Sequence, residues 1–210
     1  MSYVRLLLVL VTGLLGLAGL TSCERRGESG EEARVKLAFK SCQNALINHQ
    51  TDQAMSYFPR DVDVYLNWLN SGAATSAPLP GPEAVDSPGV NLLLRTALEK
   101  KVPADLRVRL TLGTLLQRIA DKHLLNLRDV AQIKLGPRVS INGPHASAEI
   151  YYQGTLTALR LPFIKEGNEW KIDLLSVLPS AELLMRLDRA IKGETQDHQV
   201  ERLVSKLPSL

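Results

Sequence analysis

The spacing of the apolar residues changes once along this 210-residue chain, and that change limits the folds open to it. Up to residue 123 apolar side chains recur with the period of a helix, whereas after Asn126 they alternate with period two, as in strands. Helices that precede a run of hairpin-linked strands predict an α+β domain. We therefore expect N-terminal helices packed in a curved antiparallel sheet, followed by a C-terminal helix.

Five helices are predicted before the strands. Thr51 and Asp52 are suitable N-cap residues for the second helix, and Asp61 is suitable for the third. Residues 73–89 contain four prolines and no periodicity, which predicts an irregular loop, interpreted as a mobile excursion rather than a binding lid. The predicted helices cover residues 31–49, 53–58, 61–69, 90–102 and 104–123.

The last of these segments fits two periods. Residues 106–112 alternate as in a strand, whereas the apolar residues of 112–119 recur as in a helix. The polar residues that follow are compatible with a helix, and no turn signal divides the segment. One continuous helix over residues 104–123 is therefore predicted.

The predicted strands form consecutive hairpins. Asn142-Gly143 is a strong two-residue turn signal, and Glu166-Gly167-Asn168 is a second turn. Trp170, Ile172 and Leu174 are expected to share one face of the last strand. Three or four long strands are predicted, with alternation over residues 130–135 that continues through 139–141, and then over 146–152, 155–165 and 169–177.

A C-terminal helix is predicted over residues 181–192, ended by Gly193. Its apolar residues are expected to face inward: Leu183, Leu184, Leu187 and Ile191. The tail, residues 193–210, is polar and then weakly amphipathic, which predicts a loose helix that packs on the domain or on a partner.

The N-terminus has the arrangement of an export signal. Arg5 precedes the uncharged apolar run Leu6–Leu20, which is short for a permanent membrane span. Leu20-Thr21-Ser22-Cys23 resembles the lipobox of bacterial lipoproteins, which implies cleavage after residue 22 and a lipid on Cys23. Plain secretion and an uncleaved anchor are the alternatives.

Residues 23–32 combine the lipidated cysteine with a charged, glycine-containing stretch that is typical of a flexible tether. The acyl chains expected on such a cysteine suffice for stable membrane attachment. The chain is thus expected in the cell envelope, lipid-anchored and facing the periplasm. Glu24 after the cysteine favours the outer membrane by the sorting rule of enteric lipoproteins. Residues 33–192 are predicted to form the domain.

Composition excludes two classes of protein. The net charge is only +3 with interleaved signs, and aromatic residues make up 5%, so nucleic acid is not an expected partner. The chain has two cysteines, and lipidation of the first leaves no pair for a disulfide framework. Cys42 lies on an apolar helix stripe, which favours a buried inert thiol over pairing between chains.

Three segments together resemble the nuclear-transport-factor-two-like (SnoaL-like, ketosteroid-isomerase-like) superfamily. They are LAFKSCQNALINHQTDQAMSYF, VSINGPHASAEIYYQG and LRLPFIKEGNEWKIDLL, and the most specific part is the ending E-G-N-E-W-K-I-D. The resemblance spans residues 33–178, with residues 73–116 departing from the compact pattern. It implies a cone-shaped fold with a pocket between sheet and helices, and often a homodimer through the outer face of the sheet.

Enzymes of that superfamily use a carboxylate or a His–Asp pair in an apolar pocket. Of the carboxylates, Asp61 fits a helix cap better, Glu149 and Asp173 are expected to point away from the core, and Asp63 is a further candidate. Histidines 49, 123, 145 and 198 lack metal-site spacing. No metal, cofactor or catalytic set is predicted. The residues proposed to line a pocket are Tyr65, His123, Tyr151, Tyr152 and Trp170.

The leading hypothesis is a non-enzymatic envelope lipoprotein that binds a small apolar ligand or a protein partner. A pocket-forming fold without a catalytic set motivates it. The alternatives are an isomerase, dehydratase or hydrolase of the same superfamily, and a structural subunit of an envelope complex.

Overall fold

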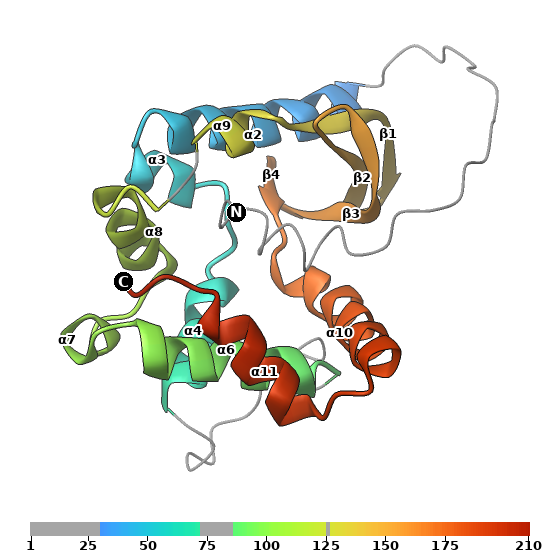
Figure 1. The fold of residues 1–210 in the computed structure, drawn as a ribbon. Coiled ribbons are helices and arrows are strands. Elements are labelled where there is room, and N and C mark those ends of the chain that lie inside the picture. The colour runs from blue at the N-terminus through green and yellow to red at the C-terminus, as the bar shows by residue number, and fades with distance from the viewer. Residues whose placement is uncertain (1–29, 72–85, 125–126) are drawn as a thin grey trace.

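The structure is a computed structural model that describes residues 30–71, 86–124 and 127–210. It combines helices with one four-stranded antiparallel sheet in the order β1-β2-β3-β4, so the predicted α+β class is confirmed (Figure 1). The export signal, Cys23 and most of the 23–32 tether lie outside the described residues, as does most of the predicted 73–89 loop. No helix among the described residues is long and apolar enough to span a membrane.

The sheet is the predicted meander of hairpins. Asn142 pairs with His145 across the first turn, and Glu166 pairs with Glu169 across the third. Gly143 and Gly167 adopt φ of 58° and 61° in these turns, a region that glycine enters without steric cost. The strands are β1 (Ile133–Asn142), β2 (His145–Tyr152), β3 (Thr155–Glu166) and β4 (Glu169–Ile172).

The predicted boundaries of the strand region, residues 130 and 177, are both wrong. The chain forms a short helix, α9 (Leu127–Ala131), before β1, and the side-chain amide of Gln43 donates to the carbonyls of Val130 (2.7 Å) and Ile133 (2.8 Å). The last strand ends at Ile172 rather than 177 and is followed by a 3-10 turn, η1 (Leu175–Val177). Asp173 causes this ending because its carboxylate accepts from the amide and the hydroxyl of Ser176.

The long helix α2 (Gly30–Ile47) covers the inner face of the sheet (Figure 1). Its stripe of Val35, Ala38 and Cys42 packs against inward residues of β2, β3 and β4. We call this group the sheet cluster. It contains Val35, Ala38, Cys42, Ala146, Ala148, Phe163, Trp170 and Ile172. The prediction of a buried Cys42 is therefore confirmed, and burial raises the pKa of its thiol to about 12.

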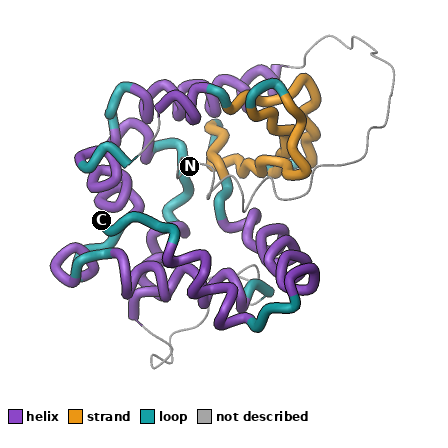
Figure 2. The backbone as a smooth tube through the Cα atoms, viewed as in Figure 1, coloured by secondary structure: helices purple, strands orange, loops and turns teal. Residues whose placement is uncertain are grey.

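A second group of buried residues, the helical cluster, lies among four helices in the other half of the molecule (Figure 2). Its helices are α4 (Asp61–Ser71), α6 (Pro88–Lys101), α10 (Leu178–Lys192) and α11 (Gln196–Ser205). The predicted loose helix of the tail is thus α11, which packs on α6 with Val200, Leu203 and Val204 buried. The short helix α3 (Thr51–Met55) contacts α8 (Leu112–Asp121) and connects the two halves.

The predicted continuous helix over residues 104–123 is wrong. It is divided into α7 (Ala104–Arg107) and α8, with Val108 81% exposed and Leu110 buried between them. Thr111 starts α8 because its side chain accepts from the amide of Thr114, whose hydroxyl accepts in turn from the Thr111 amide. The alternation across residues 106–112 therefore corresponds to the link between α7 and α8, in which Val108 is exposed and Leu110 is buried, and not to one helix.

Candidate docking surface on α10

The apolar face predicted to point inward from the C-terminal helix points outward in the structure. In α10, Leu183 is 58% exposed, Leu187 40% and Ile191 75%, whereas the buried residues are Leu178, Glu182 and Met185. The prediction for these three side chains was wrong because the helix buries a glutamate in place of the leucines. Leu184 is half-buried at the edge of this face.

The outward face of α10 is uncharged along its length. Leu183, Leu187 and Ile191 recur every four residues, and the exposed Pro179, Ser180 and Ala190 lie on the same side of the helix. From Pro179 to Ile191 this face extends about 18 Å at 1.5 Å per residue. We call these six residues the α10 face. Contiguous exposed apolar patches larger than a few hundred Å² mark interaction sites on folded proteins.

Glu182 fixes the rotation of α10 about its axis. Its side chain is only 4% exposed and accepts from the backbone amide of Val90 at 2.9 Å, at the N-terminal turn of α6. Arg186 completes the pairing with an Nε–Oε1 distance of 3.0 Å. Since a buried carboxylate requires such partners, Glu182 must face α6, and the leucines on the opposite side of the helix face outward.

The other flank of α10 is fixed by an ionic network with α11 and the connection between them. Asp188 accepts from Lys192, from Arg202 at 2.6 Å and from the side-chain amide of Gln199 at 3.0 Å. Arg202 also donates to Glu194 at 2.9 Å. Burial alone would raise the pKa of Asp188, but these hydrogen bonds bring it down to about 2. The network holds α10 and α11 in one orientation.

The five residues predicted to line a pocket do not lie together. Tyr65 is buried in the helical cluster, where its hydroxyl donates to Asn91 at 2.6 Å and burial raises its pKa. Trp170 lies in the sheet cluster and donates from Nε1 to Glu31 at 2.8 Å. His123 is exposed after α8 with φ of 52°.

Tyr151 and Tyr152 follow each other on β2, and both are half-buried. The hydroxyl of Tyr152 donates to the buried Asp129 of α9 at 3.1 Å and accepts from the side-chain amide of Gln153. Asp129 was missed from the sequence because a strand was predicted from residue 130 and no helix before it, whereas α9 spans Leu127–Ala131. This tyrosine–aspartate pair is the kind of group that the enzymatic hypothesis requires.

The four carboxylates considered from sequence each have a structural environment. Asp61 begins α4 and is exposed, while Asp63 accepts from the amide of Leu112 at 2.7 Å at the start of α8. Glu149 lies 3.9 Å from Arg160 across β2 and β3. Asp173 caps η1. Each of the last three therefore serves local structure.

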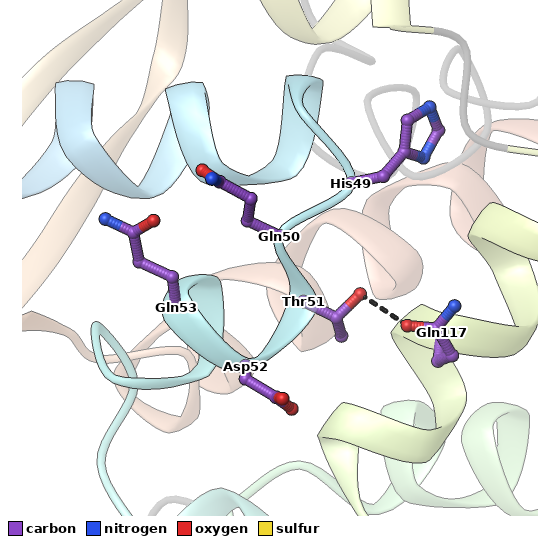
Figure 3. A pocket seen from close by; sticks show the side chains of 6 residues that line it. All are labelled: His49, Gln50, Thr51, Asp52, Gln53 and Gln117. Carbon is purple, nitrogen blue, oxygen red and sulfur yellow. Dashed lines mark hydrogen bonds between the residues drawn. The ribbon is translucent and has the colours of Figure 1, made fainter.

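A polar hollow of about 360 Å³ lies where α2, α3 and α8 meet (Figure 3). Within it, the hydroxyl of Thr51 donates to the side-chain oxygen of Gln117 at 2.9 Å. Its lining offers hydrogen bonds and one carboxylate but no apolar side chain, which does not suit an apolar ligand. The lining residues are His49, Gln50, Thr51, Asp52, Gln53 and Gln117.

Among the described residues no group of three or more histidines, cysteines or carboxylates is arranged to hold a metal ion. No protein-family model matches the chain, and no curated protein or solved structure is significantly similar to it. The resemblance to the nuclear-transport-factor-two-like superfamily stays a prediction.

Proposed function

We propose that this protein is a lipid-anchored, non-enzymatic lipoprotein of the cell envelope whose domain binds a protein partner through the α10 face. The observation that carries the proposal is the exposure of Leu183, Leu187 and Ile191 on one uncharged helix face. An exposed apolar face favours association because partner contact removes it from water. The polar lining of the hollow between α2, α3 and α8 favours a protein partner over a small apolar ligand.

The proposal includes the cone-shaped arrangement of the nuclear-transport-factor-two-like superfamily. Two features support it: α2 packs against the inner face of the antiparallel sheet, and Trp170 lies on that face as the E-G-N-E-W-K-I-D ending implies. The outer face exposes the polar Lys134, Ser140 and Arg160 and one large apolar residue, Leu156, which is 46% exposed. Because α10 presents three exposed apolar side chains on one uncharged face, hydrophobic association is better supported there than at the outer face of the sheet.

The tether and the α10 face belong to different ends of the molecule. Glu31, at the start of α2, accepts from Lys165 and Trp170 beside the β3–β4 turn. Six residues lie between Cys23 and Gly30, so the seven Cα–Cα steps that join them reach at most about 25 Å. Strand β4 leads away from that turn toward α10 (Figure 1). A lipid on Cys23 would thus hold the turn near the bilayer and leave the α10 face available to proteins of the periplasm.

The anchoring part of the proposal is tested by the mass of the N-terminal peptide of protein purified from the outer membrane. We expect a peptide that begins at Cys23 and carries a thioether-linked lipid and an acyl chain. A peptide in which unmodified Cys23 is still joined to Ser22 would contradict lipidation.

The binding part is tested with a photo-reactive phenylalanine analogue placed at Ile191 of the full chain in its own membrane. We expect adducts with a protein at Ile191 and none at the control position Val108, which is equally exposed but lies outside the α10 face. The same adduct pattern at both positions, or no protein adduct at Ile191, would contradict binding through α10.

The enzymatic alternative has one structural observation in its favour, the Tyr152–Asp129 pair. Neither residue lines the polar hollow. The test is whether the protein exchanges a substrate Cα proton with deuterated solvent. Exchange by the wild type that is lost in Asp129→Asn would favour an isomerase-type activity and contradict the non-enzymatic proposal, provided that the variant keeps the wild-type melting temperature.

A further inference from the structure

Helix α2 and the edge strand β1 lie side by side over several residues. The ammonium of Lys36 donates to the carbonyl of Pro137 at 3.3 Å, and the side-chain amide of Gln43 donates to the carbonyl of Ile133 at 2.8 Å. The two contacts show that α2 runs along β1 in the opposite direction. We call the surface formed by residues 36–43 of α2 and 133–138 of β1 the α2–β1 seam.

Three exposed cations, Lys40, Lys134 and Arg138, border the seam. Lys40 lies about one helical turn from each of the two α2 side chains that make the contacts. Lys134 and Arg138 each follow one of the two β1 residues whose carbonyls accept. Within the described part of the chain, none of the three makes an ion pair or a side-chain hydrogen bond. Their charges are therefore free to bind an external anion.

Few carboxylates oppose these charges. After Glu32, α2 contains no aspartate or glutamate, and β1 contains none. Glu32 lies one turn before Lys36 and offsets the charge of that lysine only. On the neighbouring elements, Asp129 is buried and hydrogen-bonded, and Glu149 is 16% exposed beside Arg160. The seam is thus a local excess of positive charge on a chain whose net charge is only +3.

An exposed leucine lies beside these cations. Leu37 is 63% exposed and about one turn before Lys40 on α2. An exposed apolar side chain flanked by lysines is typical of helices that lie at a lipid surface, where the lysines reach the head groups. The opposite face of α2 is packed on the sheet, so only this outward side can contact a membrane.

The length of the tether brings the seam close to the lipid on Cys23. The tether ends at Gly30 after at most about 25 Å, and Lys36 and Lys40 lie about 9 and 15 Å farther along α2. In Figure 1, α2 and α9 lie along the side of the molecule opposite α6, α10 and α11. A domain anchored before α2 can therefore rest the seam on the head groups while α10 faces away from the bilayer.

We propose that the α2–β1 seam binds the surface of the anchoring membrane, with Lys40, Lys134 and Arg138 contacting anionic phospholipid head groups and Leu37 entering the boundary with the acyl chains. The inference rests on the anchoring part of the proposed function. It goes beyond that part because a lipid on a tether attaches the domain without orienting it, whereas the seam gives the domain one orientation.

The mature lipidated chain in vesicles tests this binding. Asn44→Cys, at an exposed position of α2 beside the seam, carries a fluorophore, and the vesicles contain a lipid with a nitroxide quencher on its head group. The vesicles consist of phosphatidylcholine alone or of a mixture with anionic phosphatidylglycerol. We expect stronger quenching on the anionic vesicles, and we expect high salt to abolish the difference because it screens the charges.

Removal of the free cations tests which residues are responsible. The triple variant Lys40→Gln, Lys134→Gln, Arg138→Gln should lose the extra quenching, since each cation near an anionic surface shifts the ratio of docked to undocked protein by about fivefold. A matched control removes three exposed cations outside the seam and should keep the extra quenching: Arg109→Gln, Arg118→Gln and Lys122→Gln.

Two results would overturn the inference. One is equal quenching of the wild type on neutral and anionic vesicles. The other is an equal loss of quenching in the seam and control variants, because the response would then follow net charge and not the seam. In both cases, protein that stays on the vesicles would leave the lipid anchor standing. A chain that binds neither kind of vesicle would remove the anchor together with the inference.

Discussion

Single residues decide how the two ends of this molecule are held. Glu31 stands at the start of α2, where its carboxylate accepts from Trp170 at 2.8 Å and Lys165 at 3.1 Å. These hydrogen bonds, that of Trp170 foremost, lower the pKa of Glu31. The contact joins the segment that follows the tether to the β3–β4 hairpin, so that a pull on the tether acts on the sheet.

Replacing Glu31 with Gln should lower the melting temperature at neutral pH, because a neutral amide binds the Lys165 cation weakly. Since the pKa of Glu31 is lowered in the folded state, the stabilisation is present above its ordinary value of 4.5 and is lost as pH falls through the folded value. Thermal unfolding followed by circular dichroism from pH 7 to pH 2 measures this. A difference from wild type that is the same at pH 7 and pH 2 would contradict the assignment, and the exposed Glu99→Gln serves as control.

Gly89 allows the close approach of Glu182 to α6. A Cβ atom at Gly89 would lie 2.8 Å from Oε2 of Glu182, whereas one at Gly113 would meet its nearest neighbour, Cγ of Met55, at 3.4 Å. Both glycines are the second residue of a helix, so helix propensity affects them alike.

Gly89→Ala should therefore destabilise the fold by about 1–3 kcal/mol, as overpacking of a tight site does. Gly113→Ala should be neutral or stabilise by up to about 1 kcal/mol. Urea unfolding of the two variants gives both numbers. Equal stability of the two variants would mean that Glu182 does not hold the position described.

At the scale of elements, the hairpins were predicted correctly because a turn is determined by the few residues that form it. Gly143 and Gly167 lie in the predicted turns, and Gly167-Asn168 is the loop between Glu166 and Glu169. The first loop is Gly143-Pro144 rather than the predicted Asn142-Gly143, because Asn142 still pairs with His145. The division between α7 and α8 was missed because its cap pairs Thr111 with Thr114, whereas the familiar sequence signal has glutamate or glutamine at the second position.

The orientation of α10 could not be predicted from the spacing of its leucines. Spacing shows that a helix has an apolar face, but not that the face meets the core. Glu182 resembles a surface residue in sequence, and its burial depends on the amide of Val90, 92 positions earlier in the chain. The sequence therefore showed the apolar stripe of α10 but not which way it faces. The residues predicted to line a pocket lie in different parts of the fold, with Tyr65 in the helical cluster and Trp170 in the sheet cluster.

The contact between α10 and α11 should depend on the charge of Asp188. Asp188→Asn should lower the free energy of unfolding at pH 6 by on the order of 1 kcal/mol, since charged hydrogen bonds are replaced by weaker ones at a partly exposed site. Because the pKa of Asp188 falls from 3.8 to about 2, the advantage of the wild type should persist at pH 4 and disappear near pH 2.

Urea unfolding at several pH values measures this dependence, with Asp105→Asn on α7 as the control for an exposed carboxylate. Hydrogen exchange should locate the loss of protection in α11. Unchanged protection of α11 in Asp188→Asn would show that apolar packing of Val200 and Val204 alone holds the helix.

At the scale of the whole molecule, the two hydrophobic clusters have different roles. The sheet cluster joins α2 to the hairpins at the end that follows the tether, and the helical cluster supports α10 at the other end. An apolar face without a partner costs solubility. The α10 face and the tether belong to different clusters, which leaves the α10 face available for a protein to cover.

The accessibility of the α10 face in the native membrane tests that account most directly. Ile191→Cys and Val108→Cys, both at highly exposed positions, are labelled with a membrane-impermeant maleimide in opened envelopes and again after release into dilute detergent. We predict that Ile191→Cys reacts at least tenfold more slowly in the envelope than after release, while Val108→Cys reacts at one rate in both. Equal rates for Ile191→Cys in the two states would contradict the account, because the α10 face would then be uncovered where the protein functions.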